Sequence, residues 1–263
     1  MSDARRVLVV GALGRMGECV REALLREPTL VLGAGLENAG HPGLGSELEE
    51  GVVVTADVAA ALASCDVVID FSVPAATSAI AAQAAETGTA YVTGTTGFSA
   101  AETAALDALG KRIPLVRAAN FSLAVNVLAW LVREASGRLG ADFDAEIVEL
   151  HHTAKRDAPS GTALRLAEAV AEGRGVPLEE RLVLERAGEI GARPLGAIGV
   201  QTLRGGDNAG EHTVMFVGRG ERVELVHRSA TRDHFAAGAV RAAAWLVGRA
   251  PGVYPIEQIF GLE

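Results

Sequence analysis

The sequence predicts an α/β protein with a doubly wound parallel sheet in one domain and a mainly antiparallel or mixed sheet in a second, α+β domain. The chain opens with an apolar strand (7–10), a glycine turn (11–17) and an amphipathic helix (16–26). Strand-like and helix-like segments then alternate, which is typical of parallel strands covered by helices on both faces. Later, between residues 182 and 229, short apolar–polar runs are separated by glycine-rich turns, as expected of antiparallel strands.

The opening turn has the glycine spacing of a dinucleotide-binding site. Gly11, Gly14 and Gly17 are one residue off the usual G-x-G-x-x-G pattern, but a strand precedes them and a helix follows, as that motif requires. Glu37 ends the second predicted strand (30–37), where a carboxylate accepts hydrogen bonds from the adenosine ribose. The alternative is a turn that binds no nucleotide, with Glu37 as a surface acid.

Further strands are predicted over residues 52–57, 65–72, 89–97 and 113–120, so the first domain is expected to be Rossmann-type. Ligands bind at the carboxyl ends of parallel strands, and short motifs stand there at residues 71–74, 94–97 and 118–121. The small and hydroxyl residues of GTTG suit contact with a nicotinamide ribose, and Asn120 could hold backbone or amide groups.

The segment HHTAKRDAPSG (151–161) concentrates titratable side chains between two regular elements. The preceding residues 145–150 alternate like a half-buried strand, and residues 162–173 have helical spacing. Pro159 breaks any helix before it, and Ser160 can cap the helix that follows. The titratable groups are therefore expected to lie in a loop.

This loop is predicted to bind an anion. Lys155 and the imidazoles of His151 and His152 offer positive charge or protons. The backbone N–H groups of Gly161 and Thr162 fall at a helix N-terminus, which favours negative charge. The alternative is that the serine only caps the helix and that the histidines and the lysine are solvated.

The rest of the chain completes the domain plan. A long helix over 122–140 links the domains, an exposed loop is expected over 188–196, and the stretch 234–260 returns to helix, with Pro251 and Pro255 at its end. We expect residues 1–122 and 232–263 to form the dinucleotide-binding domain, and 123–231 the substrate-binding and oligomerisation domain. The strands predicted for the second domain cover 182–186, 197–206, 211–218 and 221–229.

Composition excludes several classes of protein. The net charge of −9 and the absence of a clustered basic face argue against nucleic acid as a partner. No apolar run reaches the roughly 20 residues of a membrane span, and no signal-peptide core follows the first residues, so a cytoplasmic protein is expected. Cys19 and Cys65 are too few for a disulfide framework and are interpreted as packing residues.

No metal site is predicted. His151 and His152 point to opposite faces if the strand persists, so both cannot bind one metal without local distortion. His212 and His227 lie in predicted strands and are interpreted as satisfied structural residues rather than ligands.

The order of four motifs carries a family resemblance: the glycine turn, GTTG (94–97), AANFS (118–122) and ELHHTAKRDAPSGTA (149–163). The chain resembles the dihydrodipicolinate reductase family, and the likeness runs nearly end to end. It continues through GEHTVMF (210–216) and residues 227–246. The resemblance implies an NADH- or NADPH-dependent reductase of lysine biosynthesis. Its substrate is the small anionic heterocycle dihydrodipicolinate, formed from 4-hydroxy-tetrahydrodipicolinate, and its product is tetrahydrodipicolinate. It also implies a homotetramer assembled through the central sheets.

The resemblance also assigns roles to residues. It implies His151 as proton donor with Lys155 as a second donor, and it implies that substrate is held by His152, Lys155, Ser160, Gly161 and Thr162. For the cofactor it marks Gly11, Ala12, Leu13, Gly14, Arg15, Met16, Glu37, Gly94, Thr95, Thr96, Ala118, Ala119, Asn120 and Phe121.

One departure bears on cofactor choice. Many relatives carry a basic residue after the acid that ends the second strand, whereas this chain has Asn38, and Arg15 is the only nearby cation. We therefore predict that NADH is used at least as well as NADPH, because Glu37 would repel a 2′-phosphate that lacks an arginine partner. Two alternatives stay open: another two-domain dehydrogenase acting on an aldehyde or sugar, and a non-enzymatic NAD-sensing regulator.

Overall fold

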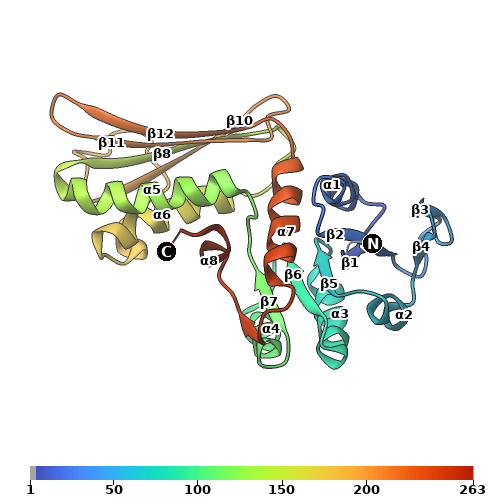
Figure 1. Cartoon of the computed structure of the whole chain (residues 1–263). Helices are drawn as coiled ribbons and strands as arrows, with labels where there is room; N and C mark the ends of the chain where they lie inside the picture. The colour runs from blue at the N-terminus through green and yellow to red at the C-terminus, as the bar shows by residue number, and fades with distance from the viewer. Residues whose placement is uncertain (1–3, 263) are drawn as a thin grey trace. The chain divides into compact units, whose positions relative to one another are not determined.

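The structure is a computed structural model that describes residues 4–262, and it divides them into two compact units (Figure 1). The first unit contains the described residues up to Leu123 together with those from Arg232 onward. The second unit is Ala124–Thr231. The chain therefore leaves the first unit, builds the second, and returns to the first.

The first unit is built on an eight-stranded sheet with the order β13-β7-β6-β5-β1-β2-β4-β3. All its neighbouring strands are parallel except the β3–β4 pair. The chain moves outward from β1 in both directions, so the strand order reverses between β1 and β5, where such sheets bind ligands. The strands are β1 (Arg5–Val10), β2 (Leu30–Leu36), β3 (Glu47–Glu49), β4 (Val52–Thr55), β5 (Val67–Asp70), β6 (Ala90–Thr93), β7 (Pro114–Arg117) and β13 (Gly252–Val253).

Helices cover both faces of this sheet, because successive side chains of a strand point to opposite sides. Val7 and Val9 of β1 pack into one core with α1 (Arg15–Leu24), α7 (Asp233–Leu246) and α8 (Ile256–Phe260). Leu8 and Val10 pack into the other core. The prediction of a doubly wound α/β domain is confirmed. The helices of the second face are α2 (Val58–Ala63), α3 (Pro74–Thr87) and α4 (Ala100–Ala108).

The end of the chain differs from the prediction of a helical return. Helix α7 stops at Leu246, and Gly248 follows with φ +82°, a backbone conformation that favours glycine and ends a helix. The chain then adds β13 beside β7, and α8 begins after Pro255 as its N-cap. Pro255 therefore precedes a helix instead of ending one, since its restricted φ suits the start of a helix.

The second unit is built on a five-stranded sheet with the order β12-β11-β8-β10-β9. β8 (Asp144–His151) is antiparallel to β11 (Gly210–Val217) and parallel to β10 (Ile198–Arg204), so the sheet is mixed. β12 (Arg222–Ser229) forms one edge. The strand predicted over 182–186 is only β9 (Leu182–Val183), because just two of its residues pair with β10 at the other edge.

Helices α5 (Leu123–Leu139) and α6 (Gly161–Arg174) cover one face of this mixed sheet (Figure 1). The side chains of β8 alternate between buried and half-buried along the whole strand. Its buried face begins with Ala145 and Ile147 but continues with Glu149, which is fully buried, and His151. One face of β8 therefore begins in the apolar core and ends with two titratable groups, Glu149 and His151, at the carboxyl end of the strand.

Within residues 4–262, no helix has the length and apolar composition needed to cross a membrane.

Candidate functional site

The turn between β1 and α1 has the backbone geometry that an anion needs. Gly11 has φ +67°, and a Cβ on Gly17 would collide with the Gly11 carbonyl oxygen and lie 2.7 Å from Cα of Ala12. Gly14 is the N-cap of α1 and makes no side-chain cap. The first N–H groups of α1 can therefore face a bound phosphate, which the helix dipole also favours.

Glu37 lies beside this turn, where its Oε1 accepts a hydrogen bond from the backbone N–H of Leu13 at 2.9 Å. It lines a cavity of about 360 Å³ together with Gly11, Asn38 and other, mainly apolar residues. The described residues that line this cavity include no lysine or arginine. The residues present thus suit an adenosine with free ribose hydroxyls.

A second cavity of the first unit, of about 300 Å³, is lined by six of the other residues predicted to hold cofactor. They are Arg15, Met16, Gly94, Ala119, Asn120 and Phe121. The remaining lining residues are Phe71, which begins the strand-end motif predicted at 71–74, and Arg232 and Phe235, which no sequence motif had marked. Arg15 is the cation predicted to lie near an adenosine phosphate, but it lines this cavity and not the one that contains Glu37.

Aromatic packing explains the glycine that opens GTTG. A Cβ on Gly94 would collide with the Phe71 ring, and Phe71 in turn meets Phe121 edge to face at 5.8 Å between ring centroids. Thr95 is buried, and its hydroxyl accepts a 2.9 Å hydrogen bond from Thr77. The Thr95 side chain therefore holds the loop to α3. The predicted cofactor residues that line neither cavity are Ala12, Leu13, Gly14, Thr95, Thr96 and Ala118.

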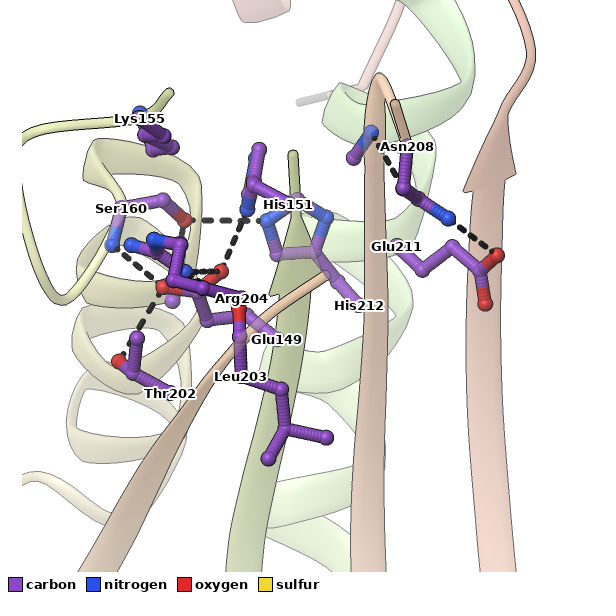
Figure 2. Close-up of polar contacts among 12 residues, drawn as sticks. Glu149, His151, Lys155, Ser160, Thr202, Leu203, Arg204, Asn208, Glu211 and His212 are labelled. Carbon is purple, nitrogen blue, oxygen red and sulfur yellow. Dashed lines mark hydrogen bonds and ion pairs between the residues drawn. The ribbon is translucent and has the colours of Figure 1, made fainter. Parts of the chain in front are cut away.

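In the second unit, polar contacts converge on the buried carboxylate of Glu149 (Figure 2). It contacts Nδ1 of His151 and accepts hydrogen bonds from Ser160 N (3.0 Å), Thr202 Oγ1 (3.2 Å) and Arg204 Nη1 (2.9 Å). Burial alone would raise the pKa of Glu149, but the hydrogen bonds from Arg204, His151 and Ser160 outweigh it, and the pKa is lowered. Glu149 is therefore an anion near neutral pH.

The imidazole of His151 is nearly buried and neutral at rest. Burial lowers its pKa, the positive charges of Lys155 and Arg204 lower it further, and Glu149 opposes them. An ionised carboxylate can only accept a hydrogen bond, so Nδ1 carries the proton and Nε2 is the unprotonated nitrogen. Nε2 lies over the start of β11, where a Cβ on Gly210 would stand 2.9 Å from it.

Ser160 caps α6 as predicted. Its hydroxyl accepts a 3.1 Å hydrogen bond from the N–H of Ala163 and contacts Nε2 of His212 at 3.1 Å, so it is engaged within the protein. Gly161 and Thr162 supply the first N–H groups of α6, and a Cβ on Gly161 would meet open space. The start of this helix can therefore be approached closely by an anion.

Lys155 and His152 lie in the loop between β8 and α6. The Lys155 ammonium donates a 2.9 Å hydrogen bond to Asp157, whose side chain is 62% exposed, so the carboxylate of a ligand can compete for it. His152 is half-buried, and its backbone N–H donates to the carbonyl oxygen of Asn208 at 2.8 Å. This bond anchors the loop to the β10–β11 turn.

The sequence predictions overlooked Glu149 and Arg204 and were wrong about His212. The ring of His212 meets His151 edge to face at 5.2 Å, and burial lowers its pKa to about 4. Its Nδ1 is buried and has no hydrogen-bond partner among the described residues, so it is not a satisfied structural histidine. The period of two could have placed Glu149 beside His151, but the register that brings β10 and β11 alongside is not visible in the sequence.

No group of three or more histidine, cysteine, aspartate or glutamate side chains that could hold a metal ion occurs between residues 4 and 262.

The two units define a class of protein: a chain with a dinucleotide-binding fold and a mixed-sheet unit that carries an imidazole–carboxylate site. A family model described as dihydrodipicolinate reductase, N-terminus, matches residues 5–121, and one described as dihydrodipicolinate reductase, C-terminus, matches residues 124–260. The chain belongs to the dihydrodipicolinate reductase family. Because the chain belongs to this family, both alternatives are rejected: a dehydrogenase acting on a sugar or aldehyde, and an NAD-sensing regulator.

Individual relatives agree over the full length. The chain is 47% identical to a 4-hydroxy-tetrahydrodipicolinate reductase of Desulfotalea psychrophila, with 98% of each chain covered. It is 48% identical to one of Afipia carboxidovorans, covering 100% of this chain and 98% of the relative. A solved dipicolinate-bound dihydrodipicolinate reductase from Paenisporosarcina sp. TG-14 has the same fold, with a TM-score of 0.78, 22% identity and coverage of 96% and 97% of the two chains.

Proposed function

We propose that this protein is a 4-hydroxy-tetrahydrodipicolinate reductase, which reduces dihydrodipicolinate to tetrahydrodipicolinate in the diaminopimelate route to lysine. The reaction consumes one reduced nicotinamide cofactor and one proton, and yields the oxidised cofactor and the reduced ring. The observation that carries the proposal is the nearly buried His151 imidazole, held by Glu149 beside Lys155 and the start of α6.

The second unit supplies the proton and holds the substrate. Hydride addition to the conjugated ring leaves enamine-like electron density that must be protonated, and imidazole suits that transfer near neutral pH. We assign the proton to His151, with Lys155 as a second donor. Because the resting imidazole is neutral, the substrate's negative charge is expected to favour the protonated form that donates. His152, Lys155, Gly161 and Thr162 are the proposed substrate contacts, whereas Ser160, also expected from the sequence, is buried and engaged within the protein.

The first unit holds the cofactor, which when bound supplies the hydride. The uncapped start of α1 would bind the pyrophosphate, and Glu37 would accept hydrogen bonds from the adenosine ribose. The cavity lined by Arg15, Asn120 and Phe121 would hold the nicotinamide half. Both NADH and NADPH are proposed cofactors, and the absence of lysine and arginine from the described lining of the Glu37 cavity favours NADH.

A homotetramer is the proposed assembly, formed through the face of the mixed sheet that α5 and α6 leave uncovered. Val148, Leu150 and Met215 are half-buried on that face, and Leu203 and Val226 are 50% and 42% exposed. Covering these apolar side chains with a second copy would gain free energy. Leu203→Asp is expected to reduce the mass measured by light scattering to that of a smaller species.

The cytoplasm is the proposed compartment. Both cysteines, Cys19 and Cys65, are free, as expected where thiols are kept reduced.

The assignment is tested by following nicotinamide absorbance with freshly prepared product of dihydrodipicolinate synthase. His151→Gln and Lys155→Ala are expected to bind cofactor normally but to lose about 10²–10⁴-fold in kcat, the range for removal of a general acid. The control is Lys111→Ala, which removes the chain's other lysine from the first unit. Full turnover in both site variants would show that the proton donors are misassigned, and absence of turnover in the unmodified protein would reject the activity.

A further inference from the structure

The buried carboxylate of Glu149 uses its full hydrogen-bonding capacity, and its donors come from three separate elements. Its two oxygens serve four donors, which come from β8, from the start of α6 and from β10 (Figure 2). One of these donors is the imidazole proposed to protonate the substrate. Another is the backbone of Ser160, which begins the helix proposed to bind substrate carboxylates.

We propose that Glu149 is the positioning residue for the proton donor: it holds His151 with the proton on Nδ1 and leaves Nε2 as the nitrogen that exchanges a proton with substrate. This inference rests on the proposed function of His151. Glu149 itself is buried and acts through the imidazole, so it is not assigned a contact with substrate.

The local geometry selects one tautomer. Glu149 and His151 are two residues apart on one strand and therefore share a face of the sheet. Because the carboxylate accepts hydrogen bonds and cannot donate them, it selects the imidazole tautomer protonated at Nδ1. A glutamine at position 149 could instead turn its amide N–H₂ toward Nδ1, which would favour the other tautomer and occupy Nε2 with the proton.

The neighbouring charges show why a carboxylate is required at this position. The titratable or charged groups around His151 are Lys155 in the loop, Arg204 on β10, His212 on β11 and Glu149 on its own strand. Glu149 is the one negative charge among these four, and it raises the pKa of His151 against the effects of burial, Lys155 and Arg204. Loss of that charge leaves the imidazole harder to protonate.

Arg204 ties the same carboxylate to the loop. Its Nη1 donates to Glu149 at 2.9 Å, and its Nη2 donates to the carbonyl oxygen of Asp157 at 2.6 Å. The second half of the loop between β8 and α6 is thus held at two points, at Asp157 through Arg204 and at Ser160 directly. Glu149 therefore sets the imidazole and the helix start in one arrangement.

Gly210 lies against the imidazole ring of His151. It has φ +150°, and a Cβ there would stand 2.9 Å from Nε2 and 3.2 Å from Cδ2 of His151. Real Cβ atoms do not approach other atoms so closely, and L side chains rarely adopt this φ, so an alanine would displace the imidazole or the backbone beside it. Gly210→Ala therefore tests the same arrangement without altering any titratable group.

The decisive comparison is Glu149→Gln against Glu146→Gln. Glu146 lies on the opposite face of the same strand, paired with Arg186 and Arg193, so its variant removes a bound carboxylate from β8 without contacting His151. Glu149→Gln is expected to lower kcat by about 10²-fold or more, with KM for dihydrodipicolinate changed less than about threefold. Glu146→Gln should leave kcat near that of the unmodified enzyme.

Two readouts separate positioning from a merely structural role. Nitrogen-15 spectra of histidine-labelled enzyme should show His151 protonated at Nδ1, and that state should be lost in Glu149→Gln and kept in Glu146→Gln. In the pH profile of kcat/KM, the fall in rate as His151 deprotonates should move to lower pH in Glu149→Gln. An unchanged tautomer together with an unchanged pH profile would overturn the proposal.

Gly210→Ala covers the case in which Glu149→Gln does not fold. This variant should lose kcat about tenfold or more while retaining cofactor affinity, and full kcat would overturn the proposal. The failure of the proposed function is distinguishable, because it would appear as full turnover in His151→Gln. Loss of turnover in His151→Gln with full turnover in Glu149→Gln and Gly210→Ala would reject the positioning role alone.

Discussion

The two units of this protein build their candidate sites in different ways. In the first unit the site is mainly backbone: a glycine turn, the start of α1, and the ends of parallel strands. In the second unit it is a cluster of charged and titratable side chains from β8, β10, β11 and the loop before α6. A backbone site is thus encoded by neighbouring residues, whereas a side-chain cluster is encoded by the pairing of distant strands.

The largest expected effect concerns the backbone site. Gly17→Ala places a Cβ against the Gly11 carbonyl and the Ala12 main chain, neither of which is the end of a flexible side chain. We expect a loss of about 3 kcal/mol or more in the free energy of unfolding, at the upper end of overpacking effects, together with loss of cofactor binding. Urea unfolding and cofactor titration measure the two. Normal values for both would contradict the packing role of this glycine.

The side-chain cluster of the second unit is expected to make the free energy of unfolding depend on pH. Burial lowers the pKa of His212 from 6.5 to about 4, so between these values the unfolded chain binds a proton that the folded chain does not. The contribution of neutral His212 to the free energy of unfolding is therefore fully present above pH 6.5 and is lost as pH falls toward 4. At about 1.4 kcal/mol per unit, the loss from His212 is roughly 3 kcal/mol.

Urea unfolding at pH 7 and pH 4.5 checks this prediction in the unmodified protein and in His212→Gln. The lowered pKa values of His151 and His227 act in the same direction, so the difference between the two proteins isolates His212. The prediction would be contradicted if the free energy of unfolding fell by the same amount between pH 7 and pH 4.5 in both proteins.

A smaller effect is expected for Gly161→Ala, the matched glycine of the second unit. Its Cβ would meet open space at the first position of α6, so the protein should be no less stable than the unmodified one. A substrate carboxylate that approaches the helix start would be displaced, and we expect KM for dihydrodipicolinate to rise about tenfold. An unchanged KM would show that substrate does not approach this glycine.

The smallest expected effect is on cofactor choice. With Glu37 and Asn38 in a cavity whose described lining has no lysine or arginine, kcat/KM for NADH should equal or exceed that for NADPH. Asn38→Arg should raise the NADPH value about tenfold by pairing with the 2′-phosphate, and Asn38→Gln should not. A hundredfold preference of the unmodified enzyme for NADPH, roughly 2.7 kcal/mol, would contradict the prediction.

Most of the first unit could be predicted because its signals are local. The strand, glycine turn and helix around Gly11 and Gly17 follow from consecutive residues, and so does the capping of α6 by Ser160. The short β13 could not be predicted, since a two-residue strand exists only because β7 offers an edge. Residues 256–260 lie within the stretch predicted as helix, but their separation as α8 could not be predicted, because five residues are too few for a recognisable helical period of their own.

Local sequence determined most strands of the two sheets, the glycine turn, the helix start at Gly161 and the close spacing of His151, which ends β8 and does not lie in the predicted loop, to Lys155 in that loop. Each of these follows from residues within a few positions of one another, where backbone sterics and hydrophobic period decide. Only the tertiary structure placed Arg204 and His212 beside Glu149 and His151. The reason is that strand register sets which distant side chains share a face, and register is decided by packing of the whole sheet.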